Sequence, residues 1–249
     1  IGASAGGLAV LKQFFAHTST DSGLAYVVVV HLMPDQPSAL AELLQPEIAM
    51  PVQQVSEDTE LVANQVYVIP PGNNLSTIDS HLRLSRIEAR RAERAQIDHF
   101  FDTLSQTHAE HCVAVILSGT GSDGSIGLSM VKERGGLTIA QEPTEAEFDG
   151  MPRSAIASGL VDLILPVQQM PEEILRFIRT SPSVEVVDEL AEQAQRERKV
   201  LQGIFAQVRA RTGQDFSRYK PSTVLRRIRR RMQLKHTEDL GRYLERLRH

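Results

Sequence analysis

Three polar residues, each directly after a predicted strand, could together carry nucleophilic chemistry. Ser4 lies in a glycine-rich turn, His31 follows the apolar run of residues 26–30, and Asp123 lies in the loop after the apolar run of residues 113–117. The carboxyl ends of parallel strands meet at one edge of a sheet, where open α/β folds bind their ligands. A serine, a histidine and an aspartate at that edge can act as a nucleophile, its base and the group that orients the base.

Each of these residues also has a simpler interpretation. The glycine turn at residues 1–7 leads into a predicted helix, so its backbone amides could instead hold a phosphate. Its spacing is neither G-x-G-x-x-G nor the Walker pattern, which argues against a dinucleotide or a nucleoside triphosphate. His31 could be a hydrogen-bonded residue at a strand end, and Asp123 could belong to an ordinary Asp-Gly turn. The chain order Ser, His, Asp also differs from that of the α/β-hydrolases.

The elements that would position these residues alternate between strand and helix. Apolar runs predict strands at 26–30, 66–69, 113–117, 137–140 and 161–165, and helical periodicity predicts helices at 8–16, 38–44, 97–108, 126–134 and 171–178. Residues 75–78 and 82–85, joined by Asp79, Ser80 and His81, predict an antiparallel hairpin. The predicted fold class is α/β: a doubly wound, mostly parallel sheet with an antiparallel hairpin, followed by a small all-α module.

The chain divides into two modules of opposite charge. A breaker cluster at residues 180–183 predicts a boundary, with a first domain at 1–180, a linker at 181–188 and a helical module at 189–249. Residues 1–188 hold 11 Lys and Arg against 24 Asp and Glu, whereas residues 189–249 hold 16 against 7. An acidic body joined to a basic tail predicts modules with different partners.

Helical periodicity covers the tail. Apolar residues recur at helical spacing from about residue 188 to a Thr-Gly stop at 212–213, including Leu190, Ala194 and Leu201. A second helix is predicted from residue 222 or 223 to 234, and a third at 238–247.

Composition excludes several classes of protein. The 249 residues are 41% hydrophobic and 23% charged, which excludes a disordered chain, a fibre and a disulfide-framed miniprotein. No apolar run approaches the roughly 20 residues of a membrane helix, so we expect no membrane insertion. Cys112 is the one cysteine, which favours a reducing, cytoplasmic compartment. We also expect no signal peptide, and a chain that opens within a strand is typical of a fragment of a longer protein.

Four motifs in the first module resemble one family. IGASAGG at 1–7, VVHLMP at 29–34, ILSGTGSDG at 116–124 and DGMPRSAI at 149–156 are similar to the catalytic domain of CheB, the chemotaxis-type protein-glutamate methylesterase. The resemblance implies that Ser4 is the nucleophile, His31 the general base and Asp123 the partner of His31. It also implies a substrate, the γ-methyl ester of a glutamate on a receptor helix, which is hydrolysed to glutamate and methanol. Members of the family also deamidate glutamine.

The chemistry implied by this resemblance needs no cofactor and no metal. Backbone amides at Ala5, Thr120 and Gly121 would hold the oxyanion, and Met151 would belong to the same pocket. The remaining histidines show neither cysteine partners nor His-Glu-x-x-His spacing. Three departures from the family pattern bear on rate and substrate preference: Ala5 replaces Thr, Thr120 replaces the Met of Gly-Met-Gly, and residues 94–98 replace Arg-Pro-Ser-Val-Asp.

The tail resembles a second family. Residues 212–232 are similar to the start of the N-terminal helical domain of CheR, the chemotaxis receptor methyltransferase. The resemblance implies a CheB–CheR fusion, with S-adenosylmethionine as a cofactor only where the methyltransferase domain is also present. The predicted helix carries five arginines, Arg226, Arg227, Arg229, Arg230 and Arg231, which would dock an acidic receptor helix. They could equally form a solvated face, with Leu225, Ile228 and Met232 packing inward.

Other functions compete with the esterase. A non-catalytic docking or regulatory scaffold in a sensory fusion protein would keep the fold without the chemistry, and the co-occurrence of Ser4, His31 and Asp123 favours the enzyme. A nucleotide-binding domain would leave His31 and Asp123 unexplained. Nucleic acid is not an expected partner, because the basic helix has no interleaved aromatic platform and the body is acidic. Contact with a response regulator or histidine kinase domain is a further expectation.

Overall fold

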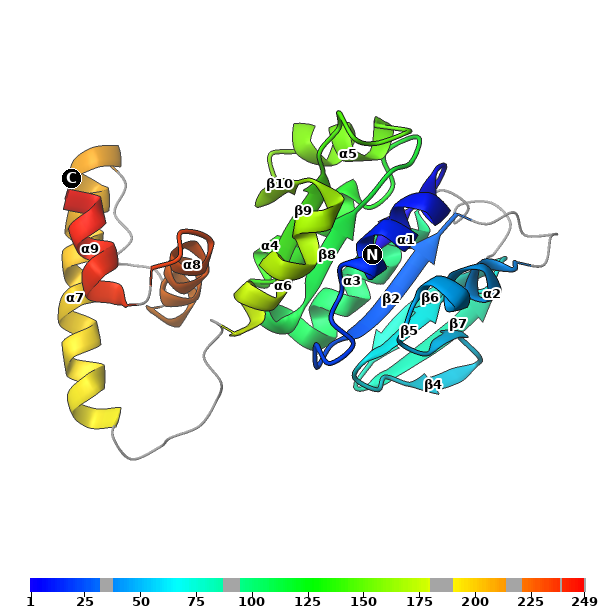
Figure 1. Ribbon diagram of the computed structural model, residues 1–249. Helices are drawn as coiled ribbons and strands as arrows, with labels where there is room; N and C mark the ends of the chain where they lie inside the picture. Colours follow the sequence, from blue (N-terminus) through cyan, green and yellow to red (C-terminus); the bar gives the residue numbers. More distant parts are fainter. Residues whose placement is uncertain (32–37, 87–94, 180–189, 214–220, 238, 249) are drawn as a thin grey trace. The chain divides into compact units, whose positions relative to one another are not determined.

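The computed structural model describes residues 1–31, 38–86, 95–179, 190–213, 221–237 and 239–248 (Figure 1). The chain divides into two compact units, Ile1–Leu175 and Arg176–His249. No helix in these described ranges is long and apolar enough to cross a membrane.

A seven-stranded sheet forms the centre of the first unit. All of its pairs are parallel, which confirms the predicted fold class. The spatial order is β10 (Leu163–Leu165), β9 (Leu137–Gln141), β8 (Val113–Ile116), β1 (Gly2–Ala3), β2 (Ala25–Val30), β5 (Gln65–Val68) and β3 (Val52–Gln54). The central strands are buried on both faces, as expected of continuous apolar runs in a parallel sheet.

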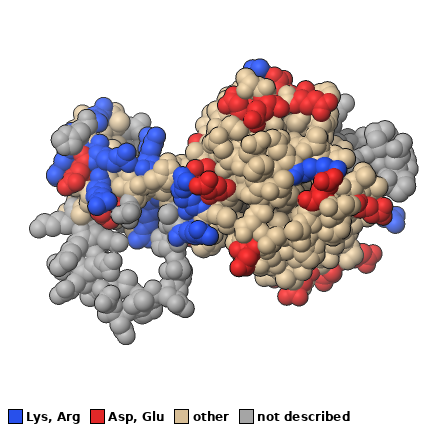
Figure 2. Space-filling model, viewed as in Figure 1, with Lys and Arg blue, Asp and Glu red and all other residues tan. Residues whose placement is uncertain are grey.

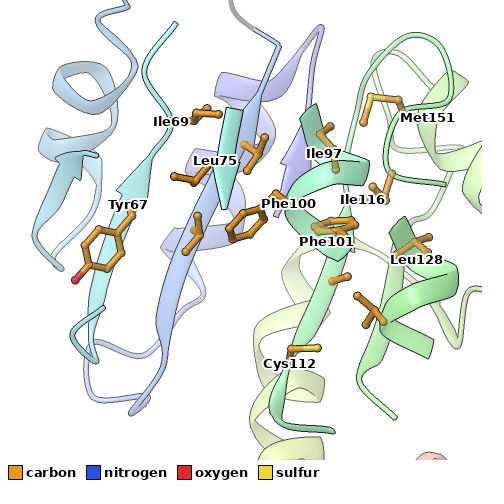
Figure 3. Close-up of a cluster of buried hydrophobic side chains, with 14 of the residues drawn as sticks. Tyr67, Ile69, Leu75, Ile97, Phe100, Phe101, Cys112, Ile116, Leu128 and Met151 are labelled. Atoms are coloured by element: carbon orange, nitrogen blue, oxygen red, sulfur yellow. The ribbon is translucent and has the colours of Figure 1, made fainter. Parts of the chain in front are cut away.

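Helices cover both faces of this sheet. On one face lie α3 (Gln96–His108), α4 (Ser125–Glu133) and α5 (Gly150–Ala157), whose apolar residues share a core with β2 and β8. Figure 3 shows Phe100 and Phe101 of α3 among Ile97, Ile116 and Leu128. On the other face, Phe14 and Phe15 of α1 (Gly7–Ala16) pack edge-on against Tyr26. Helix α2 (Leu40–Leu44) also belongs to this unit, and α6 (Met170–Arg179) runs across the boundary after Leu175.

The predicted hairpin is part of a three-stranded antiparallel sheet. Its strands are β4 (Asp58–Glu60), β7 (His81–Arg86) and β6 (Asn73–Ile78), in that order. Ile78 pairs with His81, so the loop has two residues and the three-residue turn that we predicted is wrong. Asp79, the first loop residue, has φ 53°, a left-handed conformation that aspartate tolerates better than most residues. The polar sequences of β3 and β4 carry no strand periodicity, which explains why neither was predicted.

The second unit contains three helices with their own core. These are α7 (Leu190–Thr212), α8 (Pro221–Leu234) and α9 (Leu240–Arg248). Leu201, Ile204, Ile228, Met232 and Leu244 are among the buried side chains that they share. The side chains of Leu190 and Ala194, and the expected start of the third helix at residue 238, lie outside the described residues.

Candidate active site

The register of the three central strands brings the predicted residues to one edge. Ala3 of β1 pairs with Val30 of β2, so the next residues, Ser4 and His31, leave the sheet at the same level. Gly2 pairs with Ile116 of β8, which places the loop that carries Asp123 directly on the other side of β1. Because β1 lies between β2 and β8, the three candidate residues follow three adjacent strands.

A tight turn holds Ser4 at the end of β1. The amide of Gly7 donates to the carbonyl of Ser4 at 2.9 Å, and Gly6 adopts φ 72°, a left-handed conformation that glycine adopts without steric cost. The amide of Ser4 donates to the carbonyl of Ser118 at 3.0 Å, which attaches the turn to the end of β8. The serine is therefore presented half-buried between a strand and the start of α1.

His31 and Asp123 form a close pair. Nε2 of His31 lies 2.9 Å from Oδ2 of Asp123, and the side chains are 26% and 3% exposed, respectively. This distance is that of an ion pair. The direction from Nε2 to the carboxylate lies outside hydrogen-bond geometry, so Nε2 has no aligned hydrogen-bond acceptor among the described residues. The contact leaves Nδ1 as the ring nitrogen that does not face Asp123.

Two backbone amides hold the carboxylate of Asp123. Oδ2 accepts from the amide of Ile97 and Oδ1 from the amide of Asp98, both at 3.0 Å. These amides belong to the first turn of α3, where unpaired N–H groups and the helix dipole favour a negative charge. The carboxylate is thus fixed in an orientation that brings one oxygen to His31.

Ser118 connects three segments around Ser4. Its hydroxyl donates to the carbonyl of Ala5 at 2.9 Å and accepts from the amide of Phe148 at 3.1 Å. Its amide donates to Oε1 of Gln141 at 2.8 Å, and both Ser118 and Gln141 are buried. These contacts tie the turn at residues 4–7, the end of β8 and the segment before α5 into one network. Sequence reasoning missed Ser118 and Gln141, whose only sequence signal is a polar residue at the end of a buried strand.

Gly119 lies against the turn at residues 4–7. A Cβ on Gly119 would lie 2.9 Å from Cβ of Ser4 and 2.2 Å from Sδ of Met151, so a larger residue has no room there. Met151 is fully buried and belongs to the hydrophobic core of this unit (Figure 3). Met151, which we expected in the pocket, thus packs in the core against the loop that carries Gly119, and its contact with a ligand stays a prediction.

The expected oxyanion residues lie in two segments: Ala5 in the turn after β1, and Thr120 and Gly121 in the loop after β8. Thr120 and Gly121 are exposed, and Ala5 is half-buried. The start of α5 packs on this loop: the amide of Met151 donates to the carbonyl of Gly119 at 2.8 Å, and Oγ of Ser154 donates to the carbonyl of Gly121 at 3.1 Å. The loop conformation is therefore set by β8 on one side and by α5 on the other.

Asp98 is a further acidic group beside Asp123. Its Oδ1 accepts from the amide of Gly127 at 2.6 Å. Burial raises the pKa of Asp98 above its ordinary value, and the charge of Asp123 raises it further, while the backbone amides of α4 act in the opposite direction. Within the described residues, no group of three or more His, Cys, Asp or Glu side chains is arranged to hold a metal ion.

The arginines of α8 do not share one environment. Arg227 and Arg231 are exposed, Arg229 is half-buried, and the side chain of Arg226 lies outside the described residues. Arg230 is only 8% exposed, although residues two apart on a helix do not share a face and it therefore lies on another side of α8 from the buried Ile228 and Met232. Its docking role stays a prediction. Figure 2 shows the Lys and Arg side chains gathered on the visible face of the second unit, whereas Asp and Glu predominate on the first.

Comparisons with known proteins agree with both sequence resemblances. Residues 1–174 match the family model of the CheB methylesterase, and residues 199–249 match that of the all-alpha domain of the CheR methyltransferase. The crystal structure of the Thermotoga maritima CheB methylesterase catalytic domain superposes with a TM-score of 0.64 and 27% identity, covering 70% of this chain and 94% of that one.

Two relatives show how much of a longer protein the chain represents. A 104.1 kDa protein from the hypE 3′ region of Rhodobacter capsulatus is 37% identical over 229 residues, covering 84% of this chain and 24% of its own length. A protein-glutamate methylesterase/protein-glutamine glutaminase of Clostridium acetobutylicum is 30% identical over 180 residues, covering 72% of this chain and 52% of its own. The chain thus spans a quarter to a half of these relatives. The match to the CheB methylesterase model covers residues 1–174, which is most of this chain. The chain therefore belongs to the CheB methylesterase family.

Proposed function

We propose that the first unit hydrolyses the γ-methyl ester of glutamate side chains on receptor-type helices and releases methanol. The observation that carries this proposal is the placement of Ser4, His31 and Asp123 after three adjacent parallel strands, with His31 and Asp123 only 2.9 Å apart. Membership of the CheB methylesterase family supports the same reaction class. Deamidation of glutamine at equivalent positions follows from the same chemistry, with ammonia in place of methanol.

The reaction would proceed through an acyl-enzyme. Oγ of Ser4 attacks the ester carbonyl while His31 takes its proton, and Nδ1 is the nitrogen for this step because Nε2 faces Asp123. His31 then returns the proton to the leaving methoxide, which departs as methanol. A water molecule, deprotonated by His31, then attacks the acyl-enzyme carbonyl. Oγ of Ser4 leaves and takes the proton back from His31, and the glutamic acid product ionises to the carboxylate. Asp123 stabilises the imidazolium in both halves of the reaction.

Backbone amides would stabilise the tetrahedral intermediates. The amide of Ala5 follows the nucleophile directly, and that of Gly121 belongs to the exposed loop beside it. Two such donors, aimed at the developing oxyanion, typically contribute about 10²–10³ each in kcat. Ser118 supports this role, because its hydroxyl fixes the carbonyl of Ala5 at 2.9 Å and thereby the orientation of the turn. The reaction needs neither a metal nor a cofactor.

Methanol release from a methylated receptor peptide tests the assignment. Ser4→Ala and His31→Ala should each lower kcat by about 10⁴ or more, and their combination should cost little more, because members of one catalytic unit are not additive. Asp123→Asn should be severe as well. Ser129→Ala is a matched control, since Oγ of Ser129 donates to the carbonyl of Ile126 in its own helix. Full activity of Ser4→Ala would refute the nucleophile assignment.

The second unit is the candidate partner-binding module. Exposed Arg227 and Arg231 on α8 suit the carboxylates of an acidic receptor helix, since guanidinium groups pair with carboxylates in two parallel hydrogen bonds. Replacement of both by Glu should weaken binding of an acidic receptor helix at low salt. A non-catalytic scaffold is the competing function, and it predicts binding without methanol release. Contact with a response regulator or histidine kinase domain stays a prediction.

A further inference from the structure

The two helices beside the Asp123 loop have no capping side chain of their own. The N-cap of α3 is Ala95 and that of α4 is Gly124, and neither makes a side-chain capping hydrogen bond. The first amides of an α-helix need acceptors from elsewhere, because no carbonyl within the helix reaches them. Both helices begin in the interior of the first unit, close to the proposed active site.

Each helix obtains its cap from the other segment. The carboxylate of Asp123, just before α4, accepts from the amides of Ile97 and Asp98 in α3 at 3.0 Å. The carboxylate of Asp98 in α3 accepts from the amide of Gly127 in α4 at 2.6 Å. Asp98 therefore contacts the Asp123 segment twice, once through its amide and once through its side chain. The two contacts close a ring that runs through residues 123–127.

We propose that Asp98 is a positioning residue for the His31–Asp123 pair, an inference that rests on the proposed function. Oδ1 of Asp123 is held by the amide of Asp98, and the backbone four residues later is held by the carboxylate of the same residue. Loss of that carboxylate frees the start of α4 at Ser125, which is separated from Asp123 by one residue, Gly124. The carboxylate of Asp123 then keeps its contacts with the amides of α3, but the backbone that carries it is no longer held. The distance between Asp123 and Nε2 of His31 is therefore no longer fixed.

Helices α3 and α4 pack so closely that residues 123–127 have little room to move relative to α3. A Cβ on Gly127 would lie 2.6 Å from Cβ of Phe101 and 3.0 Å from both Cα and the carbonyl oxygen of Asp98. A Cβ on Gly124, which has φ +92°, would lie 2.8 Å from Cγ2 of Ile97. The two helices thus meet backbone to backbone, and a change at Asp98 is transmitted to the Asp123 loop.

The acceptor oxygen, and not the negative charge, is what Asp98 contributes. Among the described residues, the charged group that acts on Asp98 is the neighbouring carboxylate of Asp123. Its negative charge disfavours a second negative charge on Asp98. An asparagine at position 98 keeps an oxygen for the amide of Gly127 and removes that repulsion. Asp98→Asn should therefore preserve the positioning role, whereas Asp98→Ala should abolish it.

Steady-state kinetics of the full chain on a methylated receptor peptide, with Asp98→Ala and Asp98→Asn, test the proposal. We expect Asp98→Ala to lower kcat about 10- to 100-fold with KM unchanged, and Asp98→Asn to stay within about threefold of the parent. Asp162→Ala is the matched control, because its carboxylate also accepts a backbone amide, that of Thr138 at 3.0 Å, but at the amino-terminal edge of the sheet. It should lower Tm and leave kcat unchanged.

Two results would overturn the proposal. Asp98→Ala with the parent kcat and only a lower Tm would show a purely structural cap. Asp98→Asn as impaired as Asp98→Ala would show that the charge, and not the acceptor, matters.

The ¹⁵N chemical shift of Nε2 in His31 separates this proposal from the proposed function. That shift reports the contact with Asp123 without any substrate, and it should change in Asp98→Ala but not in Asp98→Asn. If the parent chain hydrolyses no ester but shows this pattern, the proposed function fails and the positioning role stands. If the shift is the same in all three chains, the positioning role fails, whatever the activity.

Discussion

Gly119 lies between Ser4 and the buried Met151, and its replacement by alanine should disable the proposed site without abolishing the fold. The new Cβ would lie 2.2 Å from Sδ of Met151 and 2.9 Å from Cβ of Ser4. Ordinary contacts between such atoms begin near 3.5 Å, so the two gaps are short by about 1.3 and 0.6 Å. Met151 is fully buried and cannot retreat into solvent, so much of the displacement falls on Ser4.

The magnitude follows from that displacement. A misplacement of about 1 Å costs about 10² in rate, or about 2.7 kcal/mol of transition-state stabilisation. Overpacking of this kind lowers the free energy of unfolding by about 1–3 kcal/mol. The assay is methanol release from a methylated receptor peptide, together with the labelling rate of Ser4 by a fluorophosphonate, which needs no bound receptor.

A second substitution tests the cause. Met151→Ala removes the sulfur that Gly119→Ala would meet, so the double variant should regain about tenfold in kcat/KM over Gly119→Ala alone, a non-additivity expected only of residues in contact. Gly159→Ala is the control, because its Cβ would meet nothing within 4 Å and its φ of +69° predicts a loss of stability alone. Parent activity in Gly119→Ala, or no recovery in the double variant, would refute the reasoning.

Three further expectations concern stability. Ala109 has φ 46° and ψ −119°, so Ala109→Gly should raise the free energy of unfolding by about 1 kcal/mol in urea titrations, and a loss would show that the strain is absent. Burial lowers the pKa of His108 below 6.5, and His111 has a smaller effect in the same direction. The unfolded chain therefore binds the proton first, and stability falls as pH drops below about 6.5. His108→Gln should flatten that fall, measured as Tm. Burial raises the pKa of Asp98 above 3.8, so the native state keeps the proton of Asp98 to higher pH than the unfolded chain, and stability is lost as pH rises above 3.8. Asp98→Asn should therefore gain stability relative to the parent as pH rises over that range. A difference in stability that does not depend on pH would contradict this.

Local sequence patterns were sufficient to predict most strands of the parallel sheet and the kinds of residue at its edge. The apolar runs at residues 26–30 and 113–117 are too continuous for strands exposed on one face, so a parallel sheet with helices on both sides was the expected arrangement. Ser4, His31 and Asp123 each follow such a run, and the carboxyl ends of parallel strands share an edge. Periodicity also identified the three helices of the second unit, because an amphipathic helix carries its own pattern.

The order of the strands and the exchange of helix caps were decided only by the tertiary structure. No local pattern states that β1 lies between β2 and β8, yet that order brings His31 within 2.9 Å of Asp123. The capping of α3 by Asp123 and of α4 by Asp98 joins residues about 25 positions apart, beyond the range of any capping motif. Met151, expected in the pocket, and Arg230, expected among the docking arginines, are both buried, since burial depends on what packs against a residue and not on its type.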